Sequence, residues 1–339
     1  MFSELKKLRD LEKNGKITKR ELAEKVAEVR LPDFAAKISR NITTPIILLV
    51  WIIPSVSAMT LFSYSSQQDF YLKFIGFLFV PLVFILSFII TAGFFGQLAH
   101  KGIIEGKFPR IPEHPIYALR RIYGTALTQV YYFKPLYAIC LAVPVLKKLL
   151  FRMFGYRGNL SFTIYPDSWL RDFTQLKIAK GSYLANRCTV GTNICLEDGS
   201  ILVGPVDLAE DVLIGHLSVL ALSLKIGKKS MIGTGAIVGI RSNVGINIDV
   251  GPRAGINHAV TLSDNCKIGS GAIIGLKCII GRNVIVPDGA CIHPGMIINN
   301  QDELDIFLNK ENKKMEIHKE TIFQFLEEYF KDGTFARPN

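Results

Sequence analysis

A period of six residues runs through the second half of the chain. In steps of six from Ile178 to Ile292, every position holds Leu, Ile or Val, which makes twenty consecutive hexads. The position four residues into each hexad is often small, as at Cys188 and Ala254. Aliphatic and small side chains at a fixed short period indicate a solenoid of short parallel strands, in which each coil covers the next. We therefore expect a mainly β domain over 178–297, without an inserted loop.

Two uncharged stretches of 22 residues, 42–63 and 74–95, precede the repeat. A bilayer core about 30 Å thick takes roughly 20 helical residues to cross, so each stretch is long enough to span. The net charge is +4 over 1–41 and +8 over 96–177. Since basic flanks stay on the cytoplasmic side, we expect a transmembrane helical hairpin over 42–95 with both ends inside. The alternative is two buried helices in a soluble core.

Overall composition agrees with a membrane anchor. The mean hydropathy is +0.28 and the net charge is +11, and the apolar and basic excesses lie in and beside the hairpin. Basic residues there suit anionic lipid better than nucleic acid. We therefore expect a basic helical segment over 1–41, membrane lipids as partners and no nucleic acid. The expected location is multi-pass, in a bacterial inner membrane, with the solenoid in the cytoplasm.

The segments that flank the repeat are predicted to be helical. Residues 96–177 are basic and aromatic, and their apolar run Pro135–Val145 has 11 residues, followed by Lys147 and Lys148. That run is short for a span, so we expect an interfacial or reentrant segment with its Tyr, Phe, Lys and Arg at headgroup level. A third spanning helix is the alternative. Residues 298–339 are charged and amphipathic, which predicts a helical cap over the last coil.

The hexads resemble those of the hexapeptide-repeat acyltransferases. The fold of that family is a left-handed parallel β-helix of triangular section with three hexads per coil. The whole chain, with its "RRIYGTALTQVYYF" and "LLFRMFGYRG", is also similar to the membrane-embedded terminal region of nonribosomal-peptide-synthetase-like proteins. The first resemblance implies a homotrimer that uses an acyl-CoA or another acyl-thioester as donor. The acceptor would be a small molecule or peptide with a hydroxyl or amine.

Three hexads make 18 residues, so residues 18 apart are expected to stack at the inter-strand spacing of about 4.7–4.9 Å. His258 in "INHAVT" and His216 in "IGHLSV" both occupy the third, outward position of a hexad. By this spacing Asp198 is expected directly beneath His216, where its carboxylate would hold the imidazole tautomer. Leu276 is expected above His258, and Thr234 above His216.

The resemblance implies that one of these histidines is the catalytic base, because the family's catalytic histidine commonly occupies the third hexad position. His258 is the better match, since Asn257 precedes it and the polar "LSDNCKIG" follows. His216, with Asp198, is the alternative, and His293 is a weaker one. We predict that His258 takes the acceptor's proton. The donor is expected on the coil above, at Gly275, Leu276, Lys277 and Arg282.

Two other functions are compatible with such a solenoid. An outward histidine can face water or pack against another subunit, so a non-catalytic trimeric membrane scaffold is the main alternative. A γ-class carbonic anhydrase needs three imidazoles around zinc, and the solenoid histidines here are 42 and 35 residues apart. That function is disfavoured and no metal is expected. No cysteine has a clear basic partner in the sequence, so a thiol nucleophile is not expected.

Overall fold

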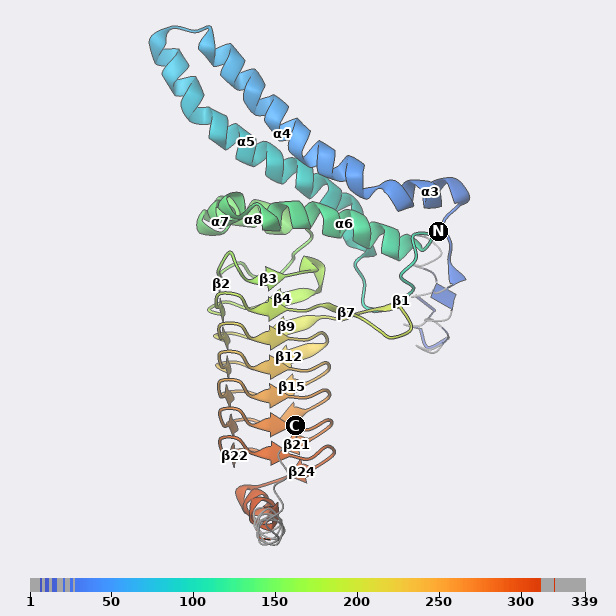
Figure 1. Cartoon of the computed structure of the whole chain (residues 1–339), viewed down its shortest axis with the longest axis vertical. Coiled ribbons are helices and arrows are strands. Elements are labelled where there is room, and N and C mark those ends of the chain that lie inside the picture. Colours follow the sequence, from blue (N-terminus) through green and yellow to red (C-terminus); the bar gives the residue numbers. More distant parts are fainter. Residues whose placement is uncertain are drawn as a thin grey trace, which may run out of the picture.

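The computed structural model describes residues 28–311 throughout, together with residues 7, 10–11, 14–16, 21, 25–26 and 320. A helical hairpin, a layer of shorter helices and a long solenoid follow one another along the molecule (Figure 1). Most of the predicted N-terminal segment 1–41 lies outside the described residues, apart from α3 (Asp33–Asn41) and its neighbours. Residues 312–319 and 321–339 of the predicted cap also lie outside them.

The hairpin consists of α4 (Thr43–Ser66) and α5 (Phe70–Ala99), which pack against each other and project away from the rest of the protein (Figure 1). In the described part of the chain, these are the two helices long and apolar enough to cross a membrane. In their most apolar 18-residue windows only 22% and 17% of the residues are buried. A helix in a soluble core would be mostly buried, so the predicted hairpin has the exposure of helices surrounded by an apolar medium.

The helical layer contains α6 (Pro115–Tyr132), α7 (Lys134–Ala142) and α8 (Pro144–Met153). Each helix has a proline in its first turn. An N–H at that position would have no intrahelical acceptor, so proline costs no hydrogen bond there. The apolar run Pro135–Val145 is divided between α7 and α8, which have 9 and 10 residues. Each is about half the length of a span. The alternative of a third spanning helix is therefore wrong.

Lys147, predicted to face lipid headgroups, points into the protein. Its side chain is buried, and Nζ donates to the carbonyl oxygens of Leu160, at 3.0 Å, and Phe162, at 2.5 Å. Nζ also lies 4.0 Å from the centre of the Phe162 ring. Burial lowers the pKa of Lys147 to about 8. The residue therefore joins the helical layer to the chain that enters the solenoid.

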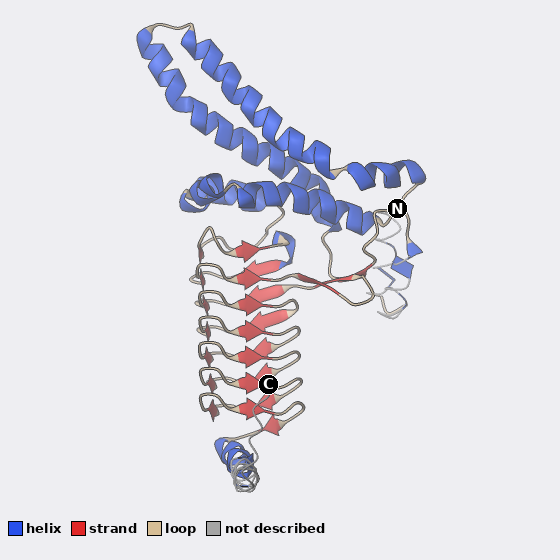
Figure 2. Ribbon diagram, viewed as in Figure 1, coloured by secondary structure: helices blue, strands red, loops and turns tan. Residues whose placement is uncertain are grey.

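The solenoid has three parallel sheets of seven strands, as the hexads predict (Figure 2). Face 1 contains β2 (Thr163–Ile164), β5 (Tyr183–Leu184), β10 (Leu213–Ile214), β13 (Met231–Ile232), β16 (Asp249–Val250), β19 (Lys267–Ile268) and β22 (Ile285–Val286). Face 2 contains β3 (Trp169–Leu170), β6 (Thr189–Val190), β11 (Val219–Leu220), β14 (Ile237–Val238), β17 (Gly255–Ile256), β20 (Ile273–Ile274) and β23 (Cys291–Ile292). Face 3 contains β4 (Leu176–Ile178), β9 (Val206–Leu208), β12 (Leu224–Ile226), β15 (Asn243–Val244), β18 (Thr261–Leu262), β21 (Ile279–Ile280) and β24 (Ile297–Ile298). The predicted left-handed parallel β-helix is confirmed.

Each coil has one strand on every face and turns at three corners. From β10 onward, paired residues are 18 apart, as Ile214 and Ile232 are. The aliphatic residue that ends each strand points inward and is buried. The small residues of the hexads, such as Cys188 and Ala254, are also fully buried. Stacking of identical inward positions therefore forms one continuous core along the solenoid.

One coil contains an insertion, so the prediction of an uninterrupted solenoid is wrong. Leu184 pairs with Ile214, 30 residues on instead of 18, so twelve additional residues lie between them. They form most of an antiparallel hairpin, β7 (Asn193–Cys195) and β8 (Ile201–Val203), which leaves the corner between faces 2 and 3 and pairs with β1 (Gly106–Phe108). Twelve residues are two hexads, so the insertion preserves the sixfold phase. Periodicity alone therefore does not reveal it.

The solenoid also begins earlier than predicted, at β2 and β3. The 3₁₀ helix η2 (Phe173–Gln175) lengthens the step from Leu170 to Ile178 to eight residues, and this breaks the phase of the hexads. Aromatic side chains join this first coil to the helical layer, with the ring of Phe151 stacked 4.5 Å from that of Phe173. A second 3₁₀ helix, η1 (His100–Gly102), follows α5. The open first coil is thus covered by helices.

A helix over 301–311 covers the other end of the solenoid. Leu304 is completely buried in the core of the last coil. The Oε1 of Gln301 accepts the backbone N–H of Ile285 at 2.8 Å, which satisfies a donor at the exposed edge of face 1. Within the described residues, the predicted C-terminal helical cap is confirmed.

Candidate functional site

The two leading histidines lie at different corners of the solenoid. His258 follows β17 at the corner between faces 2 and 3, whereas His216 follows β10 at the corner between faces 1 and 2. Both residues are exposed. Each is therefore a separate candidate, and the two imidazoles do not share a site within one chain.

The imidazole of His258 is held by the coil beneath it. Its Nδ1 accepts the backbone N–H of Ile240 at 2.9 Å. Because that nitrogen is the acceptor, the neutral ring carries its proton on Nε2. On the coil above, the N–H of Lys277 donates to the carbonyl oxygen of His258 at 3.0 Å, so Leu276 stacks over the histidine as predicted. The ring is fixed, with Nε2 as its remaining polar atom.

Two aspartates make the same contact at the other two corners. The Oδ1 of Asp264 accepts the N–H of Ile246 at 2.9 Å, and the Oδ1 of Asp288 accepts the N–H of Ser270 at 2.6 Å. In every case the acceptor lies 18 residues after the donor, which is one coil. His258 therefore has a structural role in addition to any chemical one.

Asp198 does not lie beneath His216, so that prediction is wrong. The inserted hairpin carries Asp198 away from the coil, and Asn186 takes the stacked position, where its carbonyl accepts the N–H of Leu217 at 3.2 Å. The carboxylate of Asp198 instead pairs with Lys107 at 2.5 Å. The hydrogen bond from Lys107 holds the pKa of Asp198 well below its usual range. Within residues 28–311, the His216 ring has no hydrogen-bond partner.

The four residues predicted to hold the donor are divided between two corners. Gly275, Leu276 and Lys277 follow β20 and stack above His258. Arg282 lies at the corner between faces 3 and 1, where its Nη2 is 3.5 Å from the Oδ2 of Asp264. A Cβ on Gly275 would lie 2.5 Å from the backbone nitrogen of Pro294, so close coil stacking explains this glycine.

Outward side chains on face 2 form an apolar stripe beside the corner of His258. Ile237 and Ile273 are 55% and 53% exposed. Their neighbours in the same stripe are Val219, Gly255 and Cys291. In the same coils the outward residues of faces 1 and 3 mix exposed apolar residues, such as Ile285 and Ile279, with charged or polar ones, which include Asp249, Lys267, Lys225 and Asn243. Face 2 is therefore the side on which the solenoid is best suited to pack against another molecule.

His293 contributes to the C-terminal cap. Its Nε2 lies 3.7 Å from the Oε2 of Glu311, and its ring packs edge-on against Phe307 with 5.5 Å between the ring centres. Both partners belong to the helix over 301–311. This contact gives His293 a structural role. In the described part of the chain, no group of three or more His, Cys, Asp or Glu residues could hold a metal ion.

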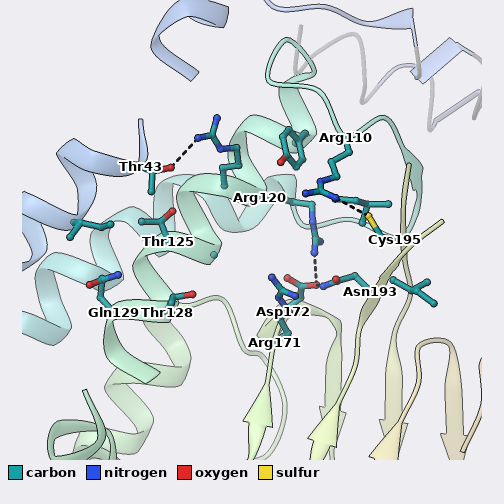
Figure 3. A pocket seen from close by; sticks show the side chains of 16 residues that line it. Thr43, Arg110, Arg120, Thr125, Thr128, Gln129, Arg171, Asp172, Asn193 and Cys195 are labelled. Carbon is teal, nitrogen blue, oxygen red and sulfur yellow. Dashed lines mark hydrogen bonds and ion pairs between the residues drawn. The ribbon is translucent and has the colours of Figure 1, made fainter. Parts of the chain in front are cut away.

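A polar cavity of about 650 Å³, which was not predicted from the sequence, lies between α6, the start of α4 and the hairpin β7–β8 (Figure 3). One face of α6 supplies much of its lining, through Arg120, Arg121, Gly124, Thr125, Thr128 and Gln129. These residues recur every three or four positions, as expected for one face of a helix. That spacing within "RRIYGTALTQ" is the signal that could have revealed the cavity. Arg110, Arg171, Asp172 and Asn193 also line the cavity, which we call the arginine pocket.

A buried ion pair lies at the wall of the arginine pocket. The Nη2 of Arg120 donates to the Oδ2 of Asp172 at 2.9 Å, and the two side chains are only 9% and 4% exposed. The same carboxylate oxygen accepts Thr192 Oγ1 at 2.8 Å and Asn193 Nδ2 at 3.0 Å. Asp172 thus joins α6 to the base of the inserted hairpin.

The pocket also contains a thiol with a basic partner. Arg110 Nη1 lies 3.3 Å from the Sγ of Cys195. The expectation that no cysteine has such a partner is wrong. The two residues are 85 positions apart, and only the pairing of β1 with β8 brings their segments together.

Among known proteins, no family model and no curated sequence matches this chain. Among solved structures, the acetyltransferase domain of PglB from Neisseria gonorrhoeae FA1090 is 22% identical with a TM-score of 0.27, over 27% of this chain and 45% of that one. WeeI from Acinetobacter baumannii AYE is 20% identical with a TM-score of 0.26, over 36% and 54%. Serine acetyltransferase 1 from Entamoeba histolytica is 14% identical with a TM-score of 0.24, over 70% and 73%.

The aligned part of this chain thus spans about half the length of the first two structures. At these identities and TM-scores the likeness concerns the fold alone. The activity, substrates and partners of this chain do not follow from it.

Proposed function

We propose that this protein is a membrane-anchored acyltransferase of the hexapeptide-repeat type. It transfers an acyl group, with acetyl as the first choice, from an acyl-thioester such as acetyl-CoA to a hydroxyl or amine. The observation that carries this proposal is the position of His258, an exposed imidazole on a rigid solenoid corner beside an apolar face. The resemblance of the hexads to that family supports the same reaction.

The hairpin of α4 and α5 anchors the protein in the membrane. Its large apolar side chains are exposed along most of its length, including Trp51, Phe62 and Phe74. Burying such side chains in lipid is favourable by roughly 25 cal/mol per Å² of apolar surface. The basic residues at both ends of the hairpin support a cytoplasmic position of the solenoid.

Three copies associate through face 2. The stripe of Ile237 and Ile273 is exposed on the single chain. In the proposed trimer a neighbour covers it, and the corner of His258, which adjoins face 2, lies at the rim of a groove between two subunits. The donor occupies this groove along the coil of Gly275, Leu276 and Lys277. Ile237→Glu and Ile273→Glu place charges in the contact, so mass measurement in detergent should give a monomer for both variants and a trimer for wild type. A wild-type monomer with full turnover would refute this assembly.

The reaction needs a group that removes a proton from the acceptor. In our proposal His258 takes this proton as the acceptor attacks the thioester carbonyl, a tetrahedral oxyanion forms beside backbone N–H groups, and the thiolate leaves and is protonated. Nε2 is the atom that reaches the groove. In the neutral ring it carries the proton while Nδ1 accepts from Ile240. Base catalysis therefore requires the Ile240 contact to be given up when substrates bind.

Two substitutions separate the chemical and structural roles of His258. His258→Ala removes both the imidazole and the acceptor for the Ile240 N–H, whereas His258→Asn retains a side-chain acceptor at this corner. Acetyl-CoA consumption is measured as thiol release, with a panel of amino sugars, amino acids and phospholipids as acceptors. Loss of a general base lowers the rate roughly 10²–10⁴-fold, so both variants should be inactive. Normal turnover in His258→Asn would leave only a structural role for this histidine.

His216→Ala is the matched control at the neighbouring corner. It should retain near-normal turnover if His258 is the base. The opposite result, with His216→Ala inactive and His258→Ala active, would assign the chemistry to His216. A scaffold is the second candidate function, and the apolar stripe on face 2 favours it equally. The scaffold function predicts no thiol release with any acceptor. It also predicts intact trimers in His258→Ala, His258→Asn and His216→Ala.

A further inference from the structure

The arginine pocket holds more positive charge than its own residues neutralise. Arg110, Arg120, Arg121 and Arg171 all line it, whereas Asp172 is its one lining carboxylate in the described residues. Arginines gathered around one concavity attract and concentrate anions. The pocket is therefore electrostatically suited to a ligand with more than one negative charge.

One donor in this pocket has no acceptor. The Nη1 of Arg120 is buried without a hydrogen-bond partner, although Nη2 of the same guanidinium binds Asp172. The side chain is 9% exposed, belongs to the cavity lining and points from α6 toward Asp172 (Figure 3). Buried N–H groups of this kind are nearly always satisfied in folded proteins. Nη1 itself is not open to the cavity, so the guanidinium has to turn for a ligand oxygen there to become the missing acceptor.

The pocket has room for such a ligand. Its volume of about 650 Å³ lies within the range of small-molecule sites. Gly124 lies on the lining face of α6, and a Cβ placed there would meet nothing within 4 Å. The hydroxyls of Thr125 and Thr128 lie on the same face of the helix. Guanidinium and hydroxyl donors around an open space suit the oxygens of a phosphate.

The pocket lies where the apolar hairpin joins the body of the protein. Thr43 and Ile47, from the first two turns of α4, line it. One turn further along, Trp51 Nε1 donates to the Oε1 of Gln129, which is also a lining residue. A headgroup at this depth could therefore place its phosphate among the arginines while its chains run beside α4.

We infer that the arginine pocket binds a phosphate-bearing anion, as a phosphate monoester or diphosphate, at the membrane end of the solenoid. The group is carried either by a lipid or by a soluble phosphate ester. This site is distinct from the corner of His258, and it does not depend on acyl transfer. The base of the inserted hairpin and His258 share one edge of the solenoid, about three coils or roughly 14–15 Å apart.

The test uses the full chain in neutral detergent and two phosphate probes, inorganic pyrophosphate and short-chain phosphatidic acid. Phosphatidylcholine, which has no monoester, is the lipid control, and binding is measured by titration and by native mass spectrometry. Gly124→Leu fills the cavity without changing the charge. Arg171→Gln removes an exposed charge, so neither variant breaks the buried pair of Arg120. Arg253→Gln, on a distant solenoid corner, is the matched control.

We expect Arg171→Gln to weaken phosphate binding roughly 10-fold or more, as for the loss of a charge-assisted hydrogen bond. Gly124→Leu should weaken it roughly 10-fold or more by occupying the space that the ligand needs. Arg253→Gln should change it less than twofold. Tighter binding of phosphatidic acid than of pyrophosphate assigns the group to a lipid. Equal affinity with mutual competition assigns it to a soluble ester. No binding of either probe would overturn the inference. Binding that is unchanged in Gly124→Leu would also overturn it, because such binding would reflect general attraction to a basic surface.

Discussion

Removal of Asp172 is expected to destabilise the protein strongly. Its Oδ2 accepts three hydrogen bonds of 2.8–3.0 Å, from Arg120, Thr192 and Asn193, and the carboxylate side chain is 4% exposed. In Asp172→Ala these three donors lose their acceptor, and the Arg120 charge remains buried without a counterion. Loss of one partner of a buried ion pair costs about 3–5 kcal/mol of unfolding free energy.

For a chain of this length we expect the melting temperature to fall by roughly 4–7 °C. The measurement is thermal unfolding in detergent, followed by tryptophan fluorescence, for wild type and Asp172→Ala. Asp167→Ala is the control, because Asp167 is exposed and its side chain makes no ion pair in the described residues. It should change the unfolding free energy by less than about 0.5 kcal/mol.

The double variant Arg120→Met with Asp172→Leu completes the test. It removes both charges together, and such replacements are often neutral or stabilising. Its melting temperature should therefore lie well above that of Asp172→Ala. If Asp172→Ala melts within about 2 °C of wild type, the pair does not hold α6 to the hairpin, and the reasoning from burial fails.

Three further predictions concern protonation, coil packing and topology. Burial lowers the pKa of Lys147 to about 8, so between about pH 8 and 10.5 the unfolded chain holds a proton that the folded protein has released, and stability rises with pH. Relative to Lys147→Met, the free energy of unfolding of the wild type, measured in urea, should rise by roughly 1–3 kcal/mol across this pH window. Parallel pH profiles of the unfolding free energy for the two proteins would contradict this. Gly239→Ala should cost about 1–3 kcal/mol, because its Cβ would lie 2.6 Å from the carbonyl carbon of Asn257. Gly255→Ala, whose Cβ would meet Ile273 at 3.9 Å, should melt like wild type, and equal losses in both would refute the argument. For topology, a membrane-impermeant thiol reagent should label Gln67→Cys from outside and Lys225→Cys, an exposed position on face 3, from inside; labelling of both from one side would exclude the hairpin.

The solenoid is predictable from the sequence because its contacts repeat. Each aliphatic residue stacks on an equivalent residue one coil away, so a local period of six determines the strands, their register and the buried set from β10 onward. The hairpin of α4 and α5 is equally predictable, since length and hydropathy alone decide which helices can be surrounded by lipid. Leu276 stacks over His258, as a spacing of 18 residues requires.

Periodicity does not reveal an insertion that equals a whole number of repeats. Twelve additional residues keep the hexad phase, so Leu196 and Leu202 look like coil positions although they belong to the inserted hairpin segment. A spacing of 18 residues therefore predicts the wrong position for Asp198, which precedes the end of the insertion. The same spacing correctly predicts that Thr234 lies above His216. Only the pairing of β8 with β1 shows that this segment has left the solenoid.

The arginine pocket depends on tertiary structure for a different reason. Its residues come from α4, from α6, from the first coil and from the inserted hairpin, and no spacing relates these segments. The polar face of α6 is visible in the sequence, but its partner across the cavity is not. Burial of Arg120 beside Asp172, with one nitrogen left without an acceptor, arises when these elements pack together. A repeating sequence thus determines the scaffold, because each residue contacts its equivalent at a fixed separation of one coil. The sites depend instead on long-range packing of segments that do not repeat.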